Sequence, residues 1–334
     1  MRQRRPTLEQ VARHAGVSRA TVSRVVNGSP TVAAEIQEQV AQSVRALGYV
    51  PNHAARSLVT QRANSFALVL PEPSTRVFSE DQFFPALIRG ISQELEPTEI
   101  QLVLMMATSP ASHARITQYV LAGHVDGAMV ASMHGADPLP MALSDTGVPV
   151  VVNGRPLAHC RVPYVDVDST GGAERAVRHL IDRGRRHIAT IAGPQDMVAG
   201  IDRLAGYHLG IDGTGQRPIV APGDFTRESG ETAMRHLLET HPAVDAVFAA
   251  SDLMAHGAIR ALRGAGRRVP DDVAVVGFDD VDLARYVDPQ LTTVRQPIGD
   301  IGRAMVRQLV TMAAGGEVEP AVILPTTLVL RESA

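Results

Sequence analysis

Residues 7–58 read TLEQVARHAGVSRATVSRVVNGSPTVAAEIQEQVAQSVRALGYVPNHAARSL. Apolar residues recur at helical spacing over 8–15, and Gly16 then ends the pattern. Thr7 precedes this helix and Gln10 lies three residues further on, which is the spacing of a capping box. These residues therefore predict both where the first helix begins and where it ends.

A second short helix is predicted directly after this turn. Ser18 can cap it, and Thr21, Val22 and Val25 continue it. Two short helices joined by a glycine-containing turn predict a helix-turn-helix, in which the first helix supports the second and the second lies in the major groove of DNA. A third helix is expected over 31–47, where the spacing of apolar residues favours packing into a small core.

The same segment is strongly basic. Residues 1–62 hold nine arginines and three glutamates, a net charge of +6, whereas the whole chain has a net charge of −3. A basic segment joined to an acidic body is expected where a protein meets phosphate. A solvated arginine-rich terminus is the alternative, but the charge coincides with the helix pair and this favours a DNA contact.

Several groups of residues extend the pattern beyond a bare helix-turn-helix: GVS at 16–18, ATVSRVVN at 20–27, LGYVPN at 47–52 and ARSL at 55–58. In this order, they resemble the DNA-binding headpiece of the LacI/GalR family of transcription regulators. The resemblance extends over essentially the whole chain. It implies an all-α headpiece over 1–50, a hinge helix and linker over 51–64, and an effector-binding and dimerisation core over 65–334.

The resemblance also implies roles for headpiece residues. Arg19, Ala20 and Arg24 fall at base-reading positions, where an arginine can make a bidentate contact with a guanine edge and alanine offers only a methyl group. Leu58 falls where a leucine wedges between central base steps, and Ala55 is small enough for two paired hinges to approach. An ordinary linker leucine is the alternative for Leu58.

The remaining candidate DNA contacts are polar or basic. Side-chain hydroxyls and amides at phosphates set the register of a protein on DNA without reading its sequence. For Ser23, a satisfied surface hydroxyl is an equal alternative. These candidates are Thr7, Ser18, Thr21, Ser23, Asn27, Asn52 and Arg56.

Length and composition indicate a globular protein of two or three domains. The chain has 334 residues, of which 45% are hydrophobic, and no apolar run approaches the ~20 residues of a membrane span. The N-terminus lacks the apolar stretch of a signal peptide, so we expect a cytoplasmic protein. Cys160 is the single cysteine, which excludes an intrachain disulfide and a cysteine-based zinc cluster. We expect no cofactor and no metal.

From residue 66 onward, short apolar runs alternate with helical patterns. This alternation predicts parallel sheets with helices on both faces, and the number of units favours two lobes. The apolar runs are 66–70, 101–106, 127–131, 148–152, 188–191, 246–249, 273–276 and 322–330. The helical patterns are 84–95, 114–121, 171–183, 227–239 and 253–265.

The resemblance agrees with this reading, because it implies an α/β two-lobe core of the periplasmic-binding-protein type (type I) with parallel sheets. The lobes of such a core exchange strands. Lobe 1 is expected over about 65–164 and 295–320, and lobe 2 over about 165–294 and 321–334. Residues 291–297 resemble the crossover back to lobe 1.

Polar residues follow several predicted strands. Ligands of open parallel sheets bind outside the carboxyl ends of the strands, and polar groups there can hydrogen-bond the hydroxyls of a polyol. By resemblance Arg203 and Asp279 contact the effector, with an internal salt bridge as the alternative. Gly154 falls where other members have an aspartate, so one hydroxyl contact is missing or comes from Asn153. The full candidate set is Phe84, Asn153, Arg155, Arg203, Phe225, Ser251 and Asp279.

The alternatives for the other candidates are structural. Phe84 and Phe225 are equally expected as core residues, and Ser251 as a helix cap. The body alone is also compatible with a transport-type sugar-binding protein, which the basic headpiece and the missing signal peptide disfavour. An enzyme is disfavoured because the chain has no Walker loop, no HExxH motif and no dinucleotide fingerprint.

Taken together, the motifs and the resemblance imply a DNA-binding repressor of carbohydrate-utilisation genes. It is expected to bind a palindromic operator as a dimer and to be controlled allosterically by a small sugar-like effector. The chain ends directly after a predicted strand without a heptad segment, so we expect a dimer and not a tetramer. The sequence specifies neither the effector nor whether it acts as inducer or co-repressor.

Overall fold

The computed structural model describes residues 6–26, 31–49, 62–78, 80–157 and 161–334. The chain forms two compact units, Met1–Ala63 and Asn64–Ala334. Most of the predicted hinge helix lies outside the described residues, as do Cys160 and five candidate DNA contacts, namely Asn27, Asn52, Ala55, Arg56 and Leu58.

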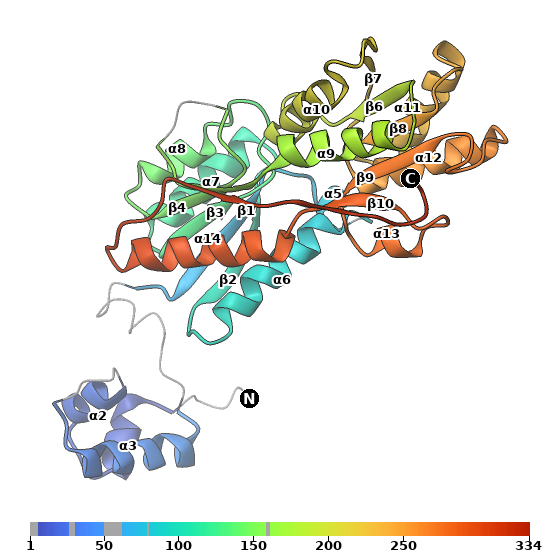
Figure 1. Ribbon diagram of the computed structural model, residues 1–334. Helices are drawn as coiled ribbons and strands as arrows, with labels where there is room; N and C mark the ends of the chain where they lie inside the picture. Colours follow the sequence, from blue (N-terminus) through green and yellow to red (C-terminus); the bar gives the residue numbers. More distant parts are fainter. Residues whose placement is uncertain (1–5, 27–30, 50–61, 79, 158–160) are drawn as a thin grey trace. The chain divides into compact units, whose positions relative to one another are not determined.

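The described part of the first unit folds into helices α1 (Leu8–His14), α2 (Arg19–Val26) and α3 (Ala34–Leu47), drawn in blue in Figure 1. Thr7 and Gln10 form the predicted capping box: the Thr7 hydroxyl accepts the Gln10 N–H and the Gln10 side chain accepts the Thr7 N–H. Gly16 has φ +63°, a left-handed conformation that favours glycine, so the first helix ends there. Val11 and Val22 are fully buried, and both belong to the small core that the three helices share.

The second unit contains two six-stranded sheets. Sheet 1 has the order β11-β5-β4-β3-β1-β2 with all pairs parallel, and sheet 2 has the order β12-β10-β9-β8-β6-β7 with only the β10–β12 pair antiparallel. Sheet 1 consists of β1 (Ser65–Leu70), β2 (Gln101–Met106), β3 (Gly127–Val130), β4 (Val150–Asn153), β5 (Tyr164–Val167) and β11 (Ala321–Leu324). Sheet 2 consists of β6 (Ile188–Ala192), β7 (Ile219–Pro222), β8 (Ala246–Ala249), β9 (Ala274–Asp279), β10 (Thr292–Arg295) and β12 (Thr327–Val329).

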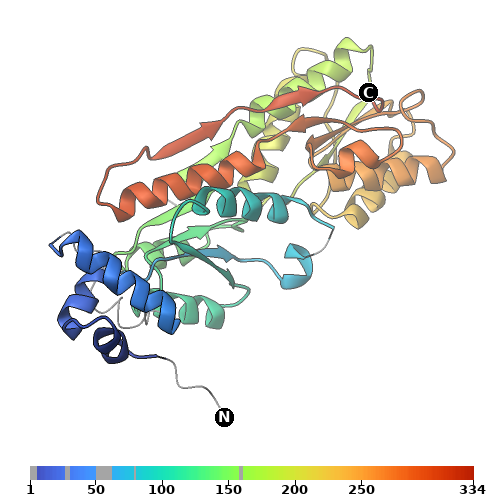
Figure 2. The same cartoon turned by 90° about the horizontal axis from the view of Figure 1, so that it is seen from below.

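Helices cover both faces of each sheet, as Figures 1 and 2 show. Successive residues of β1 alternate between the two sides: Phe66 and Leu68 pack with α6 and α14, whereas Ala67 and Val69 pack with α7 and α8. Both faces are therefore buried, which explains why the strands are continuous apolar runs. The helices of lobe 1 are α5 (Ser74–Val77), α6 (Phe83–Leu95), α7 (Pro110–Leu121), α8 (Leu139–Ser144) and α14 (Ile298–Ala313).

Sheet 2 is covered in the same way. α11 and α12 pack on one face, and α9 and α10 on the other. The helices of lobe 2 are α9 (Ser169–Asp182), α10 (Val198–Ile211), α11 (Arg227–Thr240), α12 (Asp252–Gly264) and α13 (Leu283–Tyr286). The chain passes between the lobes after β5, after β10 and after β11.

This architecture confirms the predicted two-lobe α/β core with parallel sheets, but it corrects two details. The apolar run 322–330 is not one strand: it divides into β11 in sheet 1 and β12 in sheet 2, with Pro325, which has no N–H for a ladder bond, at the break. The predicted lobe boundaries also change, because residues 165–167 and 321–324 pair in sheet 1 and therefore belong to lobe 1.

None of the helices in the described ranges has both the length and the apolar character that crossing a membrane requires.

The closest helix packing in lobe 1 gives a stability prediction. A Cβ added at Gly90 of α6 would lie 2.1 Å from the backbone oxygen of Gly299, so α6 and α14 would have to move apart. Gly90→Ala is expected to destabilise the second unit by about 1–3 kcal/mol, as overpacked cores are. The control is Gly264→Ala at the end of α12, where an added Cβ meets no described atom within 4 Å. Urea unfolding measures the free energy of unfolding of both variants. Equal values for Gly90→Ala and Gly264→Ala would contradict the close packing of α6 on α14.

Candidate functional site

Helix α2 presents the predicted base-reading residues on its solvent-exposed side. Val22 faces the headpiece core, whereas Arg19, Ala20 and Arg24 are exposed. Arg19 Nε lies 3.2 Å from Glu9 Oε1, but both side chains are more than half exposed and such pairs contribute little. No described residue forms an ion pair with Arg24. Two guanidinium groups on this side of α2 are therefore placed to meet a polyanion.

The other described candidates lie at the N-termini of α1 and α2 or, in the case of Ser23, within α2. Ser18 Oγ accepts the N–H of Thr21 at 3.1 Å and lies 2.8 Å from its hydroxyl, so Ser18 caps α2 as the sequence predicts. Thr7 is exposed at the start of α1, and Ser23 is half-buried. The structure thus places four hydroxyl-bearing candidates on or beside the first two helices.

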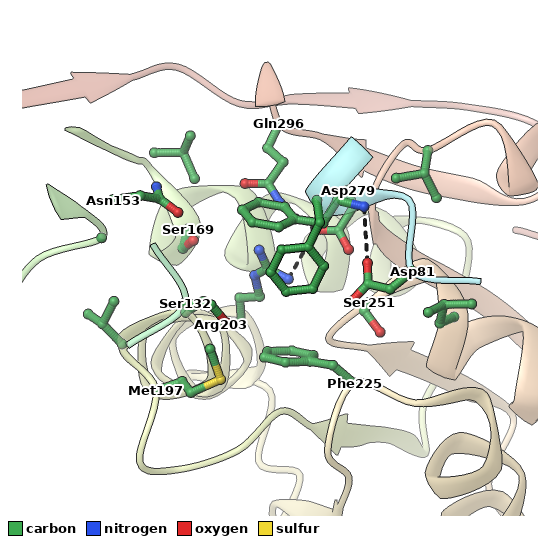
Figure 3. A pocket seen from close by; sticks show the side chains of 18 of the residues that line it. Asp81, Ser132, Asn153, Ser169, Met197, Arg203, Phe225, Ser251, Asp279 and Gln296 are labelled. Carbon is green, nitrogen blue, oxygen red and sulfur yellow. Dashed lines mark hydrogen bonds and ion pairs between the residues drawn. The ribbon is translucent and has the colours of Figure 1, made fainter. Parts of the chain in front are cut away.

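The second unit has a pocket between its two lobes, shown in Figure 3. Residues at or just beyond the carboxyl ends of strands in both sheets line it, and this is where ligands of open parallel sheets bind. Six of the seven candidate effector residues are among them: Phe84, Asn153, Arg203, Phe225, Ser251 and Asp279.

Arg203 of α10 lies at the centre of this view, with Gln296 above it and Phe225 below. It is 4% exposed, and its Nη1 lies 3.2 Å from Asp279 Oδ1 and donates to the Ala250 carbonyl at 2.6 Å. The guanidinium carbon lies 3.8 Å from the centroid of the Phe278 ring. Arg203 therefore forms the internal ion pair that was the alternative interpretation, and it also lines the pocket; its contact with an effector stays a prediction.

Asp279 has two side-chain partners on one oxygen. Gln296 Nε2 donates to its Oδ1 at 2.6 Å, and the same Oδ1 pairs with Arg203. Its backbone has φ +118°, a conformation that costs free energy and is typical of functional sites. Burial raises the pKa of Asp279 to about 6, against the charge of Arg203, which lowers it. The result is a fixed carboxylate acceptor that titrates just below neutral pH.

Two further carboxyl groups line the pocket. Asp81 accepts the N–H of Phe83 at 3.0 Å, and Asp166 accepts the N–H groups of Arg155 and Val167, each at 2.8 Å. Burial raises the pKa of both Asp81 and Asp166 above the ordinary value for aspartate. Three carboxyl groups and two guanidinium groups, including Arg76, line the pocket, so its ionised lining is acidic.

The remaining candidates line the pocket and also make hydrogen bonds that stabilise the fold. Ser251 Oγ accepts the N–H of Met254 and caps α12, as the alternative interpretation expected, yet Ser251 also lines the pocket. Asn153 donates its side-chain amide to the Val165 carbonyl at 3.2 Å. Phe83, Phe225 and Met197 supply apolar surface between these polar groups.

Arg155 is placed differently from the prediction. It does not line the pocket: its Nη2 lies 2.9 Å from Asp202 Oδ1 on α10 of the opposite lobe. The carboxylate of the facing lobe pairs with the guanidinium beside the pocket, so Arg155 links the two lobes. Gly154 before it has φ +85°, and an added Cβ would lie 3.0 Å from Val198 of lobe 2. Glycine at this departure from the family pattern therefore suits the local geometry.

Several lining residues were not predicted. Asp166 had a signal, since it alternates with buried valines at the end of a short strand. Asp81, Ser132 and Met197 lie in turns without a distinctive pattern, and Gln296 lies in the segment interpreted only as a crossover. These five residues come from both lobes and from the connection between them.

A helix-turn-helix headpiece joined to a two-lobe core with an interlobe pocket defines the class of ligand-responsive, DNA-binding regulators. Comparison with known proteins agrees. Residues 7–52 match the model for bacterial regulatory proteins of the lacI family, and residues 177–334 match the periplasmic binding protein-like domain. The chain belongs to the LacI family: it is a DNA-binding transcription regulator and not an enzyme.

Individual relatives cover nearly the whole chain. It is 48% identical over 338 residues to the HTH-type transcriptional regulator CelR of Thermobifida fusca, covering 99% of each chain. It is 33% identical over 330 residues to the ribose operon repressor of Halalkalibacterium halodurans, covering 98% of this chain and 96% of the relative.

Two solved structures have the same fold. The transcriptional regulator CelR–cellobiose complex is 46% identical with a TM-score of 0.78, covering 99% of this chain and 100% of that one. The lac repressor dimer bound to operator and an anti-inducer is 27% identical with a TM-score of 0.87, covering 99% of each chain.

Proposed function

We propose that this protein is a repressor of carbohydrate-utilisation genes that binds a palindromic operator as a homodimer. Its effector is a neutral saccharide held between the lobes. The observation that carries this proposal is the pocket in which the Arg203–Asp279 pair faces both lobes, surrounded by carboxyl groups and aromatic rings. Cellobiose is the first effector to test, because the relative that is 46% identical was solved with it.

The chemistry of the pocket suits a polyhydroxyl ligand. Carboxylates accept hydrogen bonds from hydroxyl groups, a guanidinium donates to ring and hydroxyl oxygens, and phenylalanine rings cover the apolar face of a sugar. A ligand that contacts both lobes stabilises one lobe arrangement. Operator affinity and effector affinity are then coupled reciprocally, typically by about 1–3 kcal/mol.

On the DNA side, α2 of each protomer is proposed to read one half-site. Arg19 and Arg24 are the proposed base-reading arginines, and Leu58 is the proposed minor-groove wedge. Because bacterial DNA lies in the cytoplasm, we propose that compartment for the protein.

Selection of random duplexes by the full-length protein at near-physiological salt tests this function. We expect a palindrome, bound with a Kd of about 10⁻⁸ to 10⁻¹¹ M, and we expect cellobiose to change that Kd. Binding that is weak, steeply salt-dependent and without sequence preference, with or without saccharide, would contradict the repressor function.

The acidic lining predicts discrimination by charge. A like charge about 8 Å away costs about 2 kcal/mol at an effective dielectric constant of about 20. Cellobiose 6-phosphate is therefore expected to bind at least about 30-fold more weakly than cellobiose. The matched control is 6-O-methylcellobiose, which adds bulk without charge and is expected to bind more tightly than the phosphate. Calorimetric titration measures all three, and preference for the phosphate would contradict an acidic pocket.

The raised pKa of Asp279 predicts that affinity for the saccharide falls at acid pH. Saccharide hydroxyls donate to the ionised carboxylate, so binding favours the deprotonated form and releases a proton below the pKa of about 6. Affinity for cellobiose is therefore expected to be independent of this group above pH 6 and to fall by up to about tenfold per pH unit below it. Asp279→Asn is expected to remove this acid limb. Titrations between pH 5 and neutral test it, and an unchanged limb in the variant would assign the titration to another group.

A further inference from the structure

The imidazole of His134 lies between two carboxyl groups that belong to different lobes. His134 follows β3 of lobe 1. Its Nε2 lies 3.1 Å from Glu72 Oε1, and Glu72 follows β1 of the same lobe. Its Nδ1 lies 2.9 Å from Asp196 Oδ2, and Asp196 follows β6 of lobe 2. We call these three residues the interlobe clasp.

The lobe 1 side of the clasp is fixed by burial. Glu72 is 2% exposed, and it accepts a hydrogen bond from Ser132 Oγ at 2.6 Å as well as pairing with Arg76 at 3.3 Å. Burial acts to raise the pKa of Glu72, but the His134 and Ser132 hydrogen bonds and the Arg76 charge lower it overall. Glu72 is therefore ionised at neutral pH and holds one edge of the His134 ring in place.

The lobe 2 side reaches the ring only when the lobes are together. Asp196 is exposed at its side chain, but the N–H of Gly135 donates to its carbonyl at 2.6 Å, so the two loops meet along their backbones as well. Met197 after Asp196 lines the effector pocket, and so do Ser132 and Met133 on the other side. The clasp is thus continuous with the pocket, one residue away from its lining on each lobe.

Two carboxylate acceptors on one ring require two N–H donors. Neutral imidazole has one N–H, so it satisfies either Glu72 or Asp196 and turns a lone pair towards the other, whereas imidazolium donates to both. The hydrogen bond with Glu72 raises the pKa of His134, burial opposes this, and Asp196 raises it further. The other charged or titratable groups facing this region are Arg76 beside Glu72, Asp137 in the loop of His134, and His113 of α7, 4.0 Å from Asp137.

We propose that the interlobe clasp makes lobe closure depend on a proton at His134, so that a proton acts as a second effector beside the saccharide. In the open arrangement, neutral His134 donates to Glu72 alone. Closure brings Asp196 to Nδ1 and favours the protonated ring. The clasp is therefore formed below the raised pKa of His134 and is lost as the pH rises through it. Its effect on saccharide affinity rests on the proposed function, whereas the clasp itself does not.

Histidine titration in the ligand-free, full-length protein tests the clasp without any saccharide. With ¹³C-labelled histidine, His134→Gln assigns the resonance, and we expect the pKa of His134 to lie above its ordinary value. Asp196→Asn removes the lobe 2 carboxylate and is expected to lower this pKa, while the Glu72 contribution remains. A His134 pKa that Asp196→Asn leaves unchanged would overturn the proposal.

The pH profile of cellobiose affinity tests the consequence. In the wild type, affinity is expected to fall by up to about tenfold per pH unit as His134 deprotonates, and His134→Gln is expected to lack this alkaline limb. Arg155→Gln is the matched control, because it removes the interlobe pair with Asp202, which contains no histidine. This variant should lower cellobiose affinity at every pH but keep the fall in affinity with rising pH. An alkaline limb that persists in His134→Gln would overturn the proposal; absence of cellobiose binding at any pH would instead contradict the proposed effector, and the histidine titration would then decide the clasp.

Discussion

Replacing Arg203 by methionine is expected to weaken cellobiose binding by at least about 100-fold and to leave operator binding in place. Arg203 lines the pocket from α10 and orients Asp279 at 3.2 Å, so its loss removes a charged donor and frees the neighbouring acceptor. Hydrogen bonds to charged groups contribute about 1.5–3 kcal/mol each, and two of them account for a loss of this size. The variant should be a repressor that the saccharide no longer controls.

This result needs a control for folding. Removing one partner of a buried ion pair costs about 3–5 kcal/mol, because the other charge remains buried without its counter-ion. Methionine keeps apolar contact with Phe278, and the double variant Arg203→Met/Asp279→Asn also removes the uncompensated charge. Arg235→Met changes an exposed arginine of α11 and should bind normally. Isothermal titration measures cellobiose affinity and circular dichroism checks folding in all three variants. Wild-type affinity in Arg203→Met would contradict the assignment of Arg203 to the effector site.

The strands of the core were predictable because both of their faces are buried. Residues 246–249 form β8 over the predicted range, since Val247 and Ala249 pack on one side while Ala246 and Phe248 pack on the other. Such runs stand out in sequence whatever their neighbours are. Five of the helices between them, α6, α7, α9, α11 and α12, were predicted because each buries one apolar side against a sheet, whereas α8, α10 and α14 were not predicted.

The elements that were missed or misassigned depend on distant partners. Strand β7 (IVAP) is at the edge of sheet 2 and half of it is exposed; its apolar run is short and ends in a proline, and only pairing with β6 places it in the sheet. The run 322–330 is locally uniform, and only pairing with β5 and β10 shows that its two halves belong to different sheets. Local sequence patterns indicate which residues are buried, but they do not specify which strands pair with each other.

The residues in and around the pocket also fall into a predictable and an unpredictable group. Polar residues directly after strands, such as Asn153 and Ser251, could be predicted because the fold brings strand ends together. Contacts between the lobes could not: Arg155 and Asp202 are 47 residues apart, and His134 and Asp196 are 62 apart, without any pattern that joins them. The sequence therefore predicts the place of the ligand better than the residues that hold the lobes together.

Replacing Arg24 by alanine is expected to weaken binding to the selected operator by at least about 30-fold. A bidentate arginine–guanine contact contributes about 1–3 kcal/mol of discrimination, and a dimer on a palindrome loses two of them, about 2–6 kcal/mol in total. Arg24 is exposed on α2 beyond the buried Val22, so alanine leaves the headpiece core intact. Competition between the operator and an unrelated duplex, at one fixed salt concentration, measures the loss of specificity.

Two matched variants separate base reading from simple charge. Arg45→Ala removes an exposed arginine of α3, whose charge is already paired with Glu38 at 2.9 Å, and should change operator affinity only by about the small effect of one surface charge. Arg24→Lys keeps the positive charge but loses the planar fork, so it should fall between wild type and alanine on the operator and equal wild type on unrelated DNA. An equal loss on both duplexes in Arg24→Ala would instead make Arg24 a phosphate contact. Specificity would then rest on Arg19, whose Glu9 partner would have to be displaced when it meets the base.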